Sequence, residues 1–359
     1  MTEKKILFFS CEPGGAEVLI PVIKLVAKET SYKVIVLGYG FGAERFARKG
    51  VEYIEVGRIG ENDPAIVDAY RPSLIITSAT SLPERDMSEK YLWRSARMAG
   101  IPTIAFLDQW QNYAERFSGQ SAAERLCYLP DYINCINDIG EREMIEVGFD
   151  SHSLVKLGQP YLSSLINDAE FVHTNEIKNR LGIASDQRVA LFASEAIQEH
   201  FGRSRGYDQY DALRLFLKLM LNASQEKVLL IKLHPKDTPE GYEQVLSEYP
   251  TLCSRVIRNE LSPLESIQIS DEVFGMTSIM LIESYLLGKK TVSLQPGLVG
   301  EDSCVLTRYG IIPIMLSQNI SDPVQPASAI KNNFDFEFQK NRFLKLLDSL
   351  IPRLRNQEC

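Results

Sequence analysis

The chain has 359 residues, which is long enough for two domains of ordinary size. Hydrophobic residues make up 45% of it and charged residues 24%, a globular composition that excludes a wholly disordered or fibrous protein. Its net charge of -8, from 39 basic and 47 acidic side chains, gives no general electrostatic reason to bind nucleic acid or an anionic membrane, so anionic ligands would have to be held locally.

Short apolar runs alternate with helical stretches along the first half of the chain. Strands are expected, in order, at residues 5–10, 32–40, 71–79, 101–110 and 131–137. Helices are expected between them, at residues 18–30, 91–100 and 140–148. This alternation predicts a parallel sheet that is covered by helices on both faces.

The alternation stops in a polar stretch at residues 163–183 and restarts beyond it. Strands are then expected at residues 188–195, 227–235, 254–259, 272–276 and 291–296, and helices at 210–224, 263–271 and 278–289. We therefore predict an α/β fold of two Rossmann-like, doubly wound parallel-sheet domains, divided near residues 160–187. The amphipathic tail predicts a final helix.

Three features predict a cytoplasmic protein. The six cysteines are scattered without a CxxC pair, which suits a reducing compartment. The only apolar run near the N-terminus, residues 6–9, is too short for a signal peptide, and no stretch approaches the ~20 apolar residues of a transmembrane helix. No transmembrane segment is therefore expected, while peripheral association with a membrane stays open.

The motifs of several enzyme classes are absent. The first turn, SCEPGG at residues 10–15, is not GxGxxG, and the chain has no GxxxxGK[ST], GxSxG or HExxH. The four histidines are far apart, and the nearest match to a DxD motif, at residues 335–337, lies in the tail rather than after a strand. We therefore expect no bound metal ion and no cofactor.

Ligands of open α/β sheets bind beyond the carboxyl ends of the strands, so the residues that follow each strand are the candidate site residues. After the first strand, Gly14 and Gly15 let a ligand approach the backbone at a helix start, although a turn needed only for packing explains them equally well. Glu12 and Glu17 flank this turn, either as catalytic carboxylates or as solvated charges.

A polar and aromatic segment follows the strand that ends near residue 107. It consists of Asp108, Gln109, Trp110, Gln111, Asn112 and Tyr113. A carboxylate, amides and aromatic rings at a strand end form a hydrogen-bonding and stacking surface that suits a sugar. The alternative is an ordinary loop in which Asp108 caps the next element.

The strand ends of the second half carry residue types that bind phosphate. His234 ends a strand and can donate to phosphate, Pro235 restrains the backbone beyond it, and Lys236 adds charge. Thr277 and Ser278 begin a helix, where hydroxyls, free amides and the helix dipole form an anion site or a simple helix cap.

Two further segments of the second half are candidates. Ser194 and Glu195 follow the strand at residues 188–193 and are expected to line a cleft. The basic run at residues 202–206 is either an anion-binding loop or a solvated charged segment, and the second interpretation is favoured.

The two doubly wound halves, the Gly-Gly turn, the His234-Pro235 dipeptide and the helix start at Thr277 and Ser278 together resemble GT-B glycosyltransferases. Within that class these motifs are similar to those of bacterial sialyl-, polysialyl- and Kdo-type transferases and of CDP-glycerol glycerophosphotransferases, where they bind the cytidine nucleotide donor. The segment at residues 278–297 also resembles UDP-GlcNAc 2-epimerases, which share the fold.

The resemblance implies an acceptor-binding domain at residues 1–165 and a nucleotide-donor-binding domain at 166–331, facing each other across a cleft. It also implies a C-terminal helix at 332–359 that packs back toward the first domain. The residues that it assigns to nucleotide binding are Ser194, Glu195, His234, Pro235, Lys236, Thr277, Ser278 and Glu283, the last matching an acidic residue that contacts the donor ribose. Those expected to bind the other substrate are Gly14, Gly15, Gln109, Trp110 and Asn112.

A general base is needed to take the proton of an acceptor hydroxyl, and three carboxylates of the first domain follow strands. Asp108 ranks first because a strongly apolar strand fixes its position and its neighbours suit a sugar. Glu17 ranks second, since its charge also favours a helix start, and Glu12, held extended by the following proline, ranks third.

The implied function is metal-independent transfer of a sugar from a nucleotide-activated donor to a saccharide or lipid-linked acceptor, in bacterial surface-polysaccharide or glycoconjugate synthesis. The donor would be CMP- or CDP-linked, or else UDP-linked. One alternative is a sugar-nucleotide 2-epimerase or hydrolase on the same fold, and another is a non-catalytic sugar-nucleotide-binding protein. Release of free sugar without an acceptor would favour the former, and binding without turnover the latter.

Overall fold

The structure is a computed structural model that describes residues 3–235, 237–317 and 336–351. The chain divides into two compact units. The first runs up to Ser164 and includes the described residues from Phe336 onward, and the second begins at Leu165 and includes the described residues up to 317. Helix α7 (Pro160–Ala169) carries the chain from one unit into the other.

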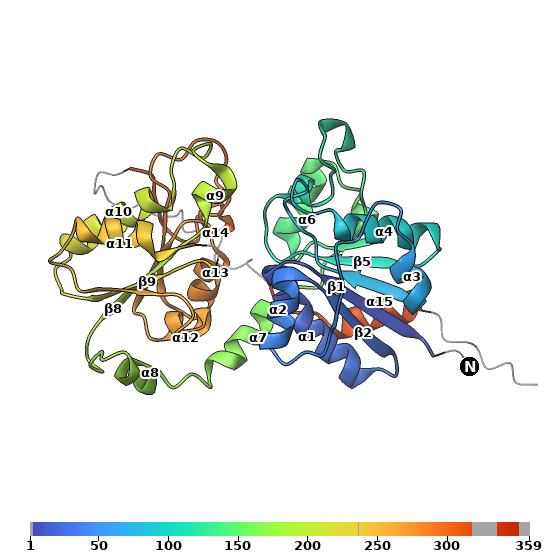
Figure 1. The fold of residues 1–359 in the computed structure, drawn as a ribbon, viewed down its shortest axis with the longest axis horizontal. Helices are drawn as coiled ribbons and strands as arrows, with labels where there is room; N and C mark the ends of the chain where they lie inside the picture. Colours follow the sequence, from blue (N-terminus) through green and yellow to red (C-terminus); the bar gives the residue numbers. More distant parts are fainter. Residues whose placement is uncertain (1–2, 236, 318–335, 352–359) are drawn as a thin grey trace, which may run out of the picture. The chain divides into compact units, whose positions relative to one another are not determined.

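A parallel sheet forms the centre of the first unit (Figure 1). It has seven strands in the order β3-β2-β1-β4-β5-β6-β7. The strands are β1 (Lys5–Ser10), β2 (Lys33–Gly38), β3 (Ile54–Glu55), β4 (Leu74–Thr77), β5 (Thr103–Phe106), β6 (Tyr132–Asn134) and β7 (Leu154–Val155). The helices are α1 (Pro13–Glu29), α2 (Gly40–Arg48), α3 (Ala65–Tyr70), α4 (Ser88–Met98), α5 (Tyr113–Arg116), α6 (Asp138–Val147) and α15 (Lys340–Leu350), with 3-10 turns at Ala122–Glu124 and Ser151–Ser153.

The apolar strands of this sheet are covered on both faces. Successive side chains of a strand point to opposite faces, and in β1 Ile6 and Phe8 belong to one buried cluster while Leu7 and Phe9 belong to another. All four are fully buried. This double burial is typical of parallel sheets and explains why the strands read as continuous apolar runs in the sequence.

The C-terminal segment completes the core of the first unit. Phe343 and Leu347 of α15 are fully buried in the cluster that contains Ile6 and Phe8, and the ring of Phe343 lies 5.8 Å from that of Phe106. The helix spans Lys340–Leu350, and the expected helical residues 332–335 and 352–359 lie outside the described part.

Hydrogen bonds attach the segment before α15 to the start of α7. The amide of Gln159 donates to the carbonyl oxygen of Phe336 at 2.8 Å, and the Ser163 hydroxyl accepts from the amide of Phe338 at 2.6 Å. The points where the chain leaves and re-enters the first unit are therefore joined directly.

A second parallel sheet forms the centre of the second unit (Figure 1). It has six strands in the order β10-β9-β8-β11-β12-β13. The strands are β8 (Val189–Ala193), β9 (Val228–Lys232), β10 (Ser254–Ile257), β11 (Glu272–Gly275), β12 (Lys290–Leu294) and β13 (Ile314–Met315). The helices are α8 (Thr174–Arg180), α9 (Ile197–Phe201), α10 (Gln209–Leu221), α11 (Pro239–Ser247), α12 (Pro263–Gln268), α13 (Ile279–Leu286) and α14 (Val305–Arg308).

The same strand order occurs in both sheets. Counted within each unit, the first six strands run 3-2-1-4-5-6, the order of Rossmann domains. The direction of winding reverses between β1 and β4 in the first unit and between β8 and β11 in the second. Ligands of such sheets bind at these switch points, beyond the carboxyl ends of the strands. In the part of the chain that the structure describes, no helix has the length and apolar character needed to span a membrane.

Candidate functional site

The loop after β1 packs tightly against two other strand ends of the first unit. A Cβ atom at Gly15 would collide with the Ser78 hydroxyl, and one at Gly14 would lie 2.5 Å from Oδ2 of Asp108. Ser78 follows β4 and Asp108 follows β5, so three strand ends converge on the start of α1. The two glycines are therefore needed to admit the protein's own side chains.

Asp108 is held in a fixed position at this edge of the sheet. Its Oδ1 lies 2.8 Å from Nη1 of Arg116, and its carbonyl oxygen accepts a hydrogen bond of 3.0 Å from Nε2 of Gln159. Arg116 is 4% exposed and also donates to the carbonyl oxygens of Ala79 and Gln111. Because 23% of its side chain remains exposed, Asp108 combines fixed orientation with access for a substrate.

The other two candidate bases are placed differently. Glu17 pairs with Arg45 at 3.0 Å and with Lys49 at 3.8 Å, so its carboxylate is directed toward α2 and the residue that follows it. Glu12 is the N-cap residue of α1 with an extended backbone, and its side chain makes no capping hydrogen bond. Of the three, Asp108 is the carboxylate that lies against the Gly14 turn.

The side chain of Trp110 is buried, whereas Gln109 and Asn112 of the same segment are partly exposed. Its side chain is 1% exposed, and Nε1 donates to Oδ1 of Asn137 at 2.8 Å, so no ring face is offered for a sugar to stack on. Gln109 and Asn112 are half-buried. Gln109 accepts a hydrogen bond of 2.9 Å from Gln111, and Asn112 adopts the left-handed backbone (φ 56°) at the start of α5. Both amides stay accessible for polar contacts.

A charged cluster that the sequence did not indicate lies beneath the β4–α4 loop. Glu89 accepts hydrogen bonds from the Ser78 hydroxyl and the Thr80 amide, and Nζ of Lys90 donates to the carbonyl oxygen of Thr80 at 3.2 Å. Both α4 side chains are at most 2% exposed. Burial raises the pKa of Glu89 and lowers the pKa of Lys90 to about 8. The hydrogen bonds of Glu89 and Lys90 thus fix the position of the loop at residues 78–80.

The Lys90 ammonium should make stability depend on pH in the alkaline range. Since its pKa falls from 10.5 to about 8, the folded protein binds fewer protons than the unfolded chain between these pH values. The contribution of this group to the free energy of unfolding therefore rises with pH through that window, by about 3 kcal/mol in total. Urea denaturation of wild type and Lys90→Met at pH 8 and pH 10 measures this effect. Between these two pH values, the free energy of unfolding of wild type should rise relative to that of the variant. Lys24→Met, at an exposed position of α1, is the control. The prediction is contradicted if the free energy of unfolding changes with pH by the same amount in wild type and in Lys90→Met.

An anion cradle occupies the switch point of the second unit. The amides of Thr277 and Ser278 donate to Oε1 of Glu195 at 2.5 and 2.7 Å, and the Thr277 hydroxyl donates to Oε2 at 2.7 Å. Glu195 follows β8, and Thr277 and Ser278 follow β11. The three predicted residues are thus brought together, with the carboxylate of one seated on the amides of the other two.

The electrostatic environment of Glu195 combines opposing effects. Desolvation raises the pKa of Glu195, and the hydrogen bonds from Thr277 and Ser278 and the positive charge of Arg205 offset only part of that rise. The guanidinium of Arg205 lies over the ring of Phe201, 3.9 Å from its centroid. Of the basic run, Arg205 therefore belongs to this site.

Arg203, the other arginine of the basic run, is engaged elsewhere. It pairs with Asp208 at 3.1 Å and with Asp211, the two residues that form the capping box of α10. Its side chain is 65% exposed, which agrees with the favoured interpretation of a solvated charge.

Asp237 organises the loop that begins at His234. Its Oδ2 accepts from the Ser194 hydroxyl at 2.7 Å, from the Tyr242 hydroxyl at 2.6 Å and from the amide of His234 at 3.2 Å. Asp237 is 2% exposed, and only its position three residues after the histidine could have indicated its role from the sequence. Ser194, predicted to contact nucleotide, is 4% exposed within this group, whereas His234 is half-buried.

The remaining predicted residues of the second unit are dispersed. Pro235 is exposed, and its carbonyl oxygen accepts from Nη2 of Arg258 at 2.7 Å. Glu283, on α13, is 2% exposed. Lys236 lies outside the described residues.

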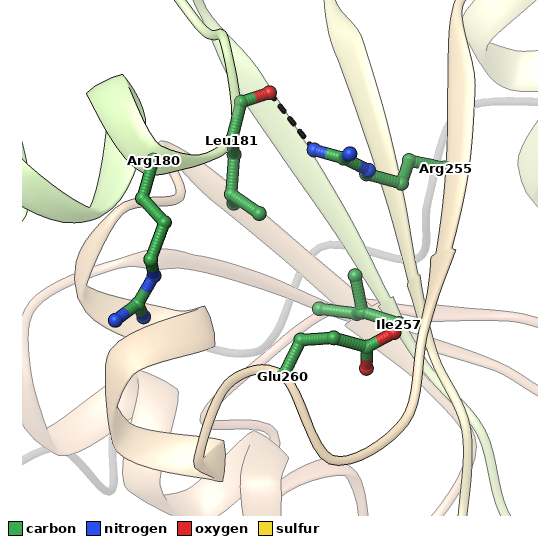
Figure 2. Close-up of a pocket in the computed structure, with 5 residues that line it drawn as sticks. All are labelled: Arg180, Leu181, Arg255, Ile257 and Glu260. Carbon is green, nitrogen blue, oxygen red and sulfur yellow. Dashed lines mark hydrogen bonds between the residues drawn. The ribbon is translucent and has the colours of Figure 1, made fainter.

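The predicted site residues do not line the hollow of about 360 Å³ that lies in the second unit (Figure 2). It is lined by Arg180, Leu181, Arg255, Ile257 and Glu260, beside the edge strand β10. One wall is fixed by a hydrogen bond of 2.8 Å from Arg255 to the carbonyl oxygen of Leu181, which Figure 2 shows as a dashed line. Because Rossmann-like sheets bind ligands at the switch point, the candidate site is the Glu195 cradle rather than this hollow. Among the described residues, no three His, Cys, Asp or Glu side chains are grouped so as to hold a metal ion.

No family model and no curated protein matches the sequence. Among solved structures, the protein is similar to S. aureus MnaA in a co-structure with UDP, with a TM-score of 0.68, 12% identity and 96% of each chain covered. It is similar to a UDP-GlcNAc 2-epimerase from Neisseria meningitidis bound to UDP-GlcNAc, with a TM-score of 0.63, 12% identity and coverage of 96% and 91%. It is also similar to a glycosyltransferase from Rickettsia africae, with a TM-score of 0.60, 12% identity and coverage of 98% and 100%.

At 12% identity these likenesses establish the fold alone. They confirm the predicted fold class, two Rossmann-like parallel-sheet units of the GT-B class. The finer resemblance, to sialyl-, polysialyl-, Kdo-type and CDP-glycerol transferases, stays a prediction.

Proposed function

We propose that the protein is an enzyme that acts on a nucleotide-activated sugar and transfers the sugar to a hydroxyl acceptor. The observation that carries the proposal is the cradle at the switch point of the second unit, where two consecutive amides and a hydroxyl of Thr277 and Ser278 already stabilise an anion. The structural neighbours add support, since those named above include proteins bound to UDP or UDP-GlcNAc.

The proposed chemistry assigns the leaving phosphate to the second unit. The acceptor oxygen forms a bond to the anomeric carbon as the bond from that carbon to the nucleotide phosphate breaks, and the electron pair of that bond stays on the phosphate. Amide donors and His234, which follows β9, stabilise the charge that develops there. The acceptor hydroxyl loses its proton to Asp108 of the first unit. No step of this scheme requires a metal ion.

A second candidate, 2-epimerisation of a sugar nucleotide, is favoured by the names of several structural neighbours. The protein from Neisseria meningitidis and one from Methanocaldococcus jannaschii (TM-score 0.59, 10% identity) are both described as UDP-GlcNAc 2-epimerases. Epimerisation at C2 breaks a carbon–hydrogen bond, so the product would take up solvent hydrogen, whereas glycosyl transfer leaves that bond intact.

Binding and turnover experiments separate the candidates. A thermal-shift screen of UDP, CDP, CMP and GDP should identify one nucleotide that stabilises the protein, by about 2.7 kcal/mol at 100 times its dissociation constant. Incubation with UDP-GlcNAc in D2O, followed by mass spectrometry, then reports deuterium in the sugar for an epimerase. Acceptor-dependent release of UDP, unchanged by EDTA, supports the transferase. Failure of every nucleotide to stabilise the protein would refute the proposal.

Replacing His234 with alanine should weaken the interaction with the nucleotide phosphates. A hydrogen bond to a charged group contributes roughly 1.5 to 3 kcal/mol, which corresponds to a loss of about 10- to 150-fold in nucleotide affinity or in kcat/KM. His152→Ala is the control, because that side chain is 92% exposed and pairs only with Asp150 among the ion pairs of the described residues. Calorimetry on both variants makes the comparison. Equal affinities for wild type and His234→Ala would identify the histidine as structural.

A further inference from the structure

The cradle at Thr277 and Ser278 is already occupied by a side chain of the same protein. Oε1 of Glu195 accepts from two consecutive amides, and Oε2 accepts from the Thr277 hydroxyl. Successive amides that converge on one oxygen form a concave site that binds anions. The carboxylate therefore sits in the position that an oxygen of a phosphate group would take.

The start of α13 does not need this carboxylate as a cap. Its N-cap residue, Ser278, already accepts a hydrogen bond of 3.2 Å from the Met280 amide through its own hydroxyl, and the carbonyl oxygen of Ser278 accepts from Leu281 at 3.0 Å. The amides that hold Glu195 precede the helix proper. Capping of α13 therefore does not account for the contact with Glu195.

The side chain of Glu195 can move out of the cradle without disturbing buried residues. Its side chain is partly exposed, in contrast to its neighbours Ser194 and Ala196, which are at most 4% exposed. Arg205, whose charge acts on Glu195, is also only half-buried. A positive side chain beside the cradle suits an incoming phosphate as well as it suits the carboxylate.

We infer that Glu195 is an internal competitor that fills the phosphate position in the free protein and is displaced when a diphosphate ligand binds. The inference rests on the proposed function for the identity of the ligand, a nucleoside diphosphate group, and adds a residue that sets its affinity. A ligand that binds only the open form has its apparent affinity lowered by the fraction of open molecules.

The expected effect of removing the competitor follows from that fraction. Minor conformations are commonly populated at about 0.1 to 10%, so loss of the Glu195 carboxylate should tighten binding by about 10- to 1000-fold. Glu195→Ala should show the largest gain in affinity. Glu195→Gln should gain less, because an amide oxygen can still accept one of the hydrogen bonds. In both variants the free protein should melt at a lower temperature than wild type, since the cradle has lost its occupant.

The experiment is calorimetric titration of wild type, Glu195→Ala and Glu195→Gln with inorganic pyrophosphate and, separately, with UDP. Glu199→Gln is the matched control, because it removes the same charge from α9, where the carboxylate accepts from Gln209 at 3.0 Å. It should bind both probes as wild type does. A gain in Glu199→Gln equal to that of Glu195→Gln would overturn the inference, because the effect would then be one of overall charge.

A second measurement requires no variant. In ¹⁵N-labelled wild type, saturating pyrophosphate should shift the amide resonances of Thr277 and Ser278, since these two amides exchange a carboxylate for a phosphate acceptor. Unshifted resonances at saturation would overturn the inference.

The two probes separate failure of the inference from failure of the proposed function. UDP binding that is equal in wild type and both Glu195 variants overturns the inference and leaves the function standing. Tighter pyrophosphate binding by the variants without UDP binding by any protein supports the competitor role and refutes the nucleotide. Absence of binding by either probe to every protein overturns both.

Discussion

Replacing Asp108 with asparagine is expected to lower turnover of the sugar nucleotide by about 10²- to 10⁴-fold, the range typical of a positioned general base. An amide cannot take the acceptor proton, but it has the same shape as the carboxylate and leaves the surrounding packing intact. Nucleotide affinity should stay within a few-fold of wild type, because the phosphate cradle belongs to the other unit. Steady-state kinetics and calorimetry on the same preparation test both statements.

The loss of the ion pair with Arg116 needs its own control. Arg116 is 4% exposed, but it keeps its hydrogen bonds to the carbonyl oxygens of Ala79 and Gln111 in the variant, so the fold should persist. Glu115→Gln removes the same charge from an exposed position of α5 and should be fully active. If Asp108→Asn turns over at the wild-type rate, or if it loses nucleotide affinity and activity together, Asp108 is not the base.

Replacing Trp110 with alanine should destabilise the protein by about 3 to 5 kcal/mol, the usual cost of deleting a fully buried aromatic side chain. The ring is 1% exposed, and its Nε1 donates to Oδ1 of Asn137. That oxygen also accepts from the amides of Ile139 and Gly140 and so caps α6. The substitution therefore leaves a cavity beneath the start of a helix.

Urea denaturation measures this cost, and Trp110→Phe separates its parts. Phenylalanine keeps one aromatic ring but loses the hydrogen bond and part of the buried volume, so a smaller loss than that of Trp110→Ala is expected, while Asn137 still caps the helix. Acceptor binding by the folded fraction should be unchanged in both variants. Retained stability with weakened acceptor binding would instead make Trp110 a sugar-stacking residue.

The sequence predicted the sheets well because burial on both faces leaves a direct signal. The strands β1, β2, β4, β8 and β9 each lie within an expected range. The two-residue strands β3 (Ile54–Glu55), β7 (Leu154–Val155) and β13 (Ile314–Met315) were missed, because two residues carry no periodicity. The hydroxyl pair was also placed correctly, since Ser278 is the N-cap of α13.

The contacts within the candidate site could not be predicted from spacing. Glu195 and Thr277 are separated by 82 residues, and the pattern of either segment alone does not show that the carboxylate of one meets the amides of the other. The burial of Glu89 and Lys90 could not be predicted either, because such side chains are rarely buried without partners, and their partner is the Ser78–Thr80 loop, which the sequence does not reveal. Nor could the burial of Trp110 be predicted, since an aromatic side chain at a strand end can point into the core or toward solvent.

The hydrogen bonds that join Gln159 to Phe336 make the second unit, in effect, an insertion within the first. A ribosome therefore completes the second unit before it makes Phe343 and Leu347, which the first unit needs to close its core. At about 5 to 20 residues per second, synthesis of residues 165–335 takes roughly 10 to 30 s. During that interval the nascent first unit exposes the apolar surface around Phe106, so the part of the protein that is made first is also the last to be protected from aggregation.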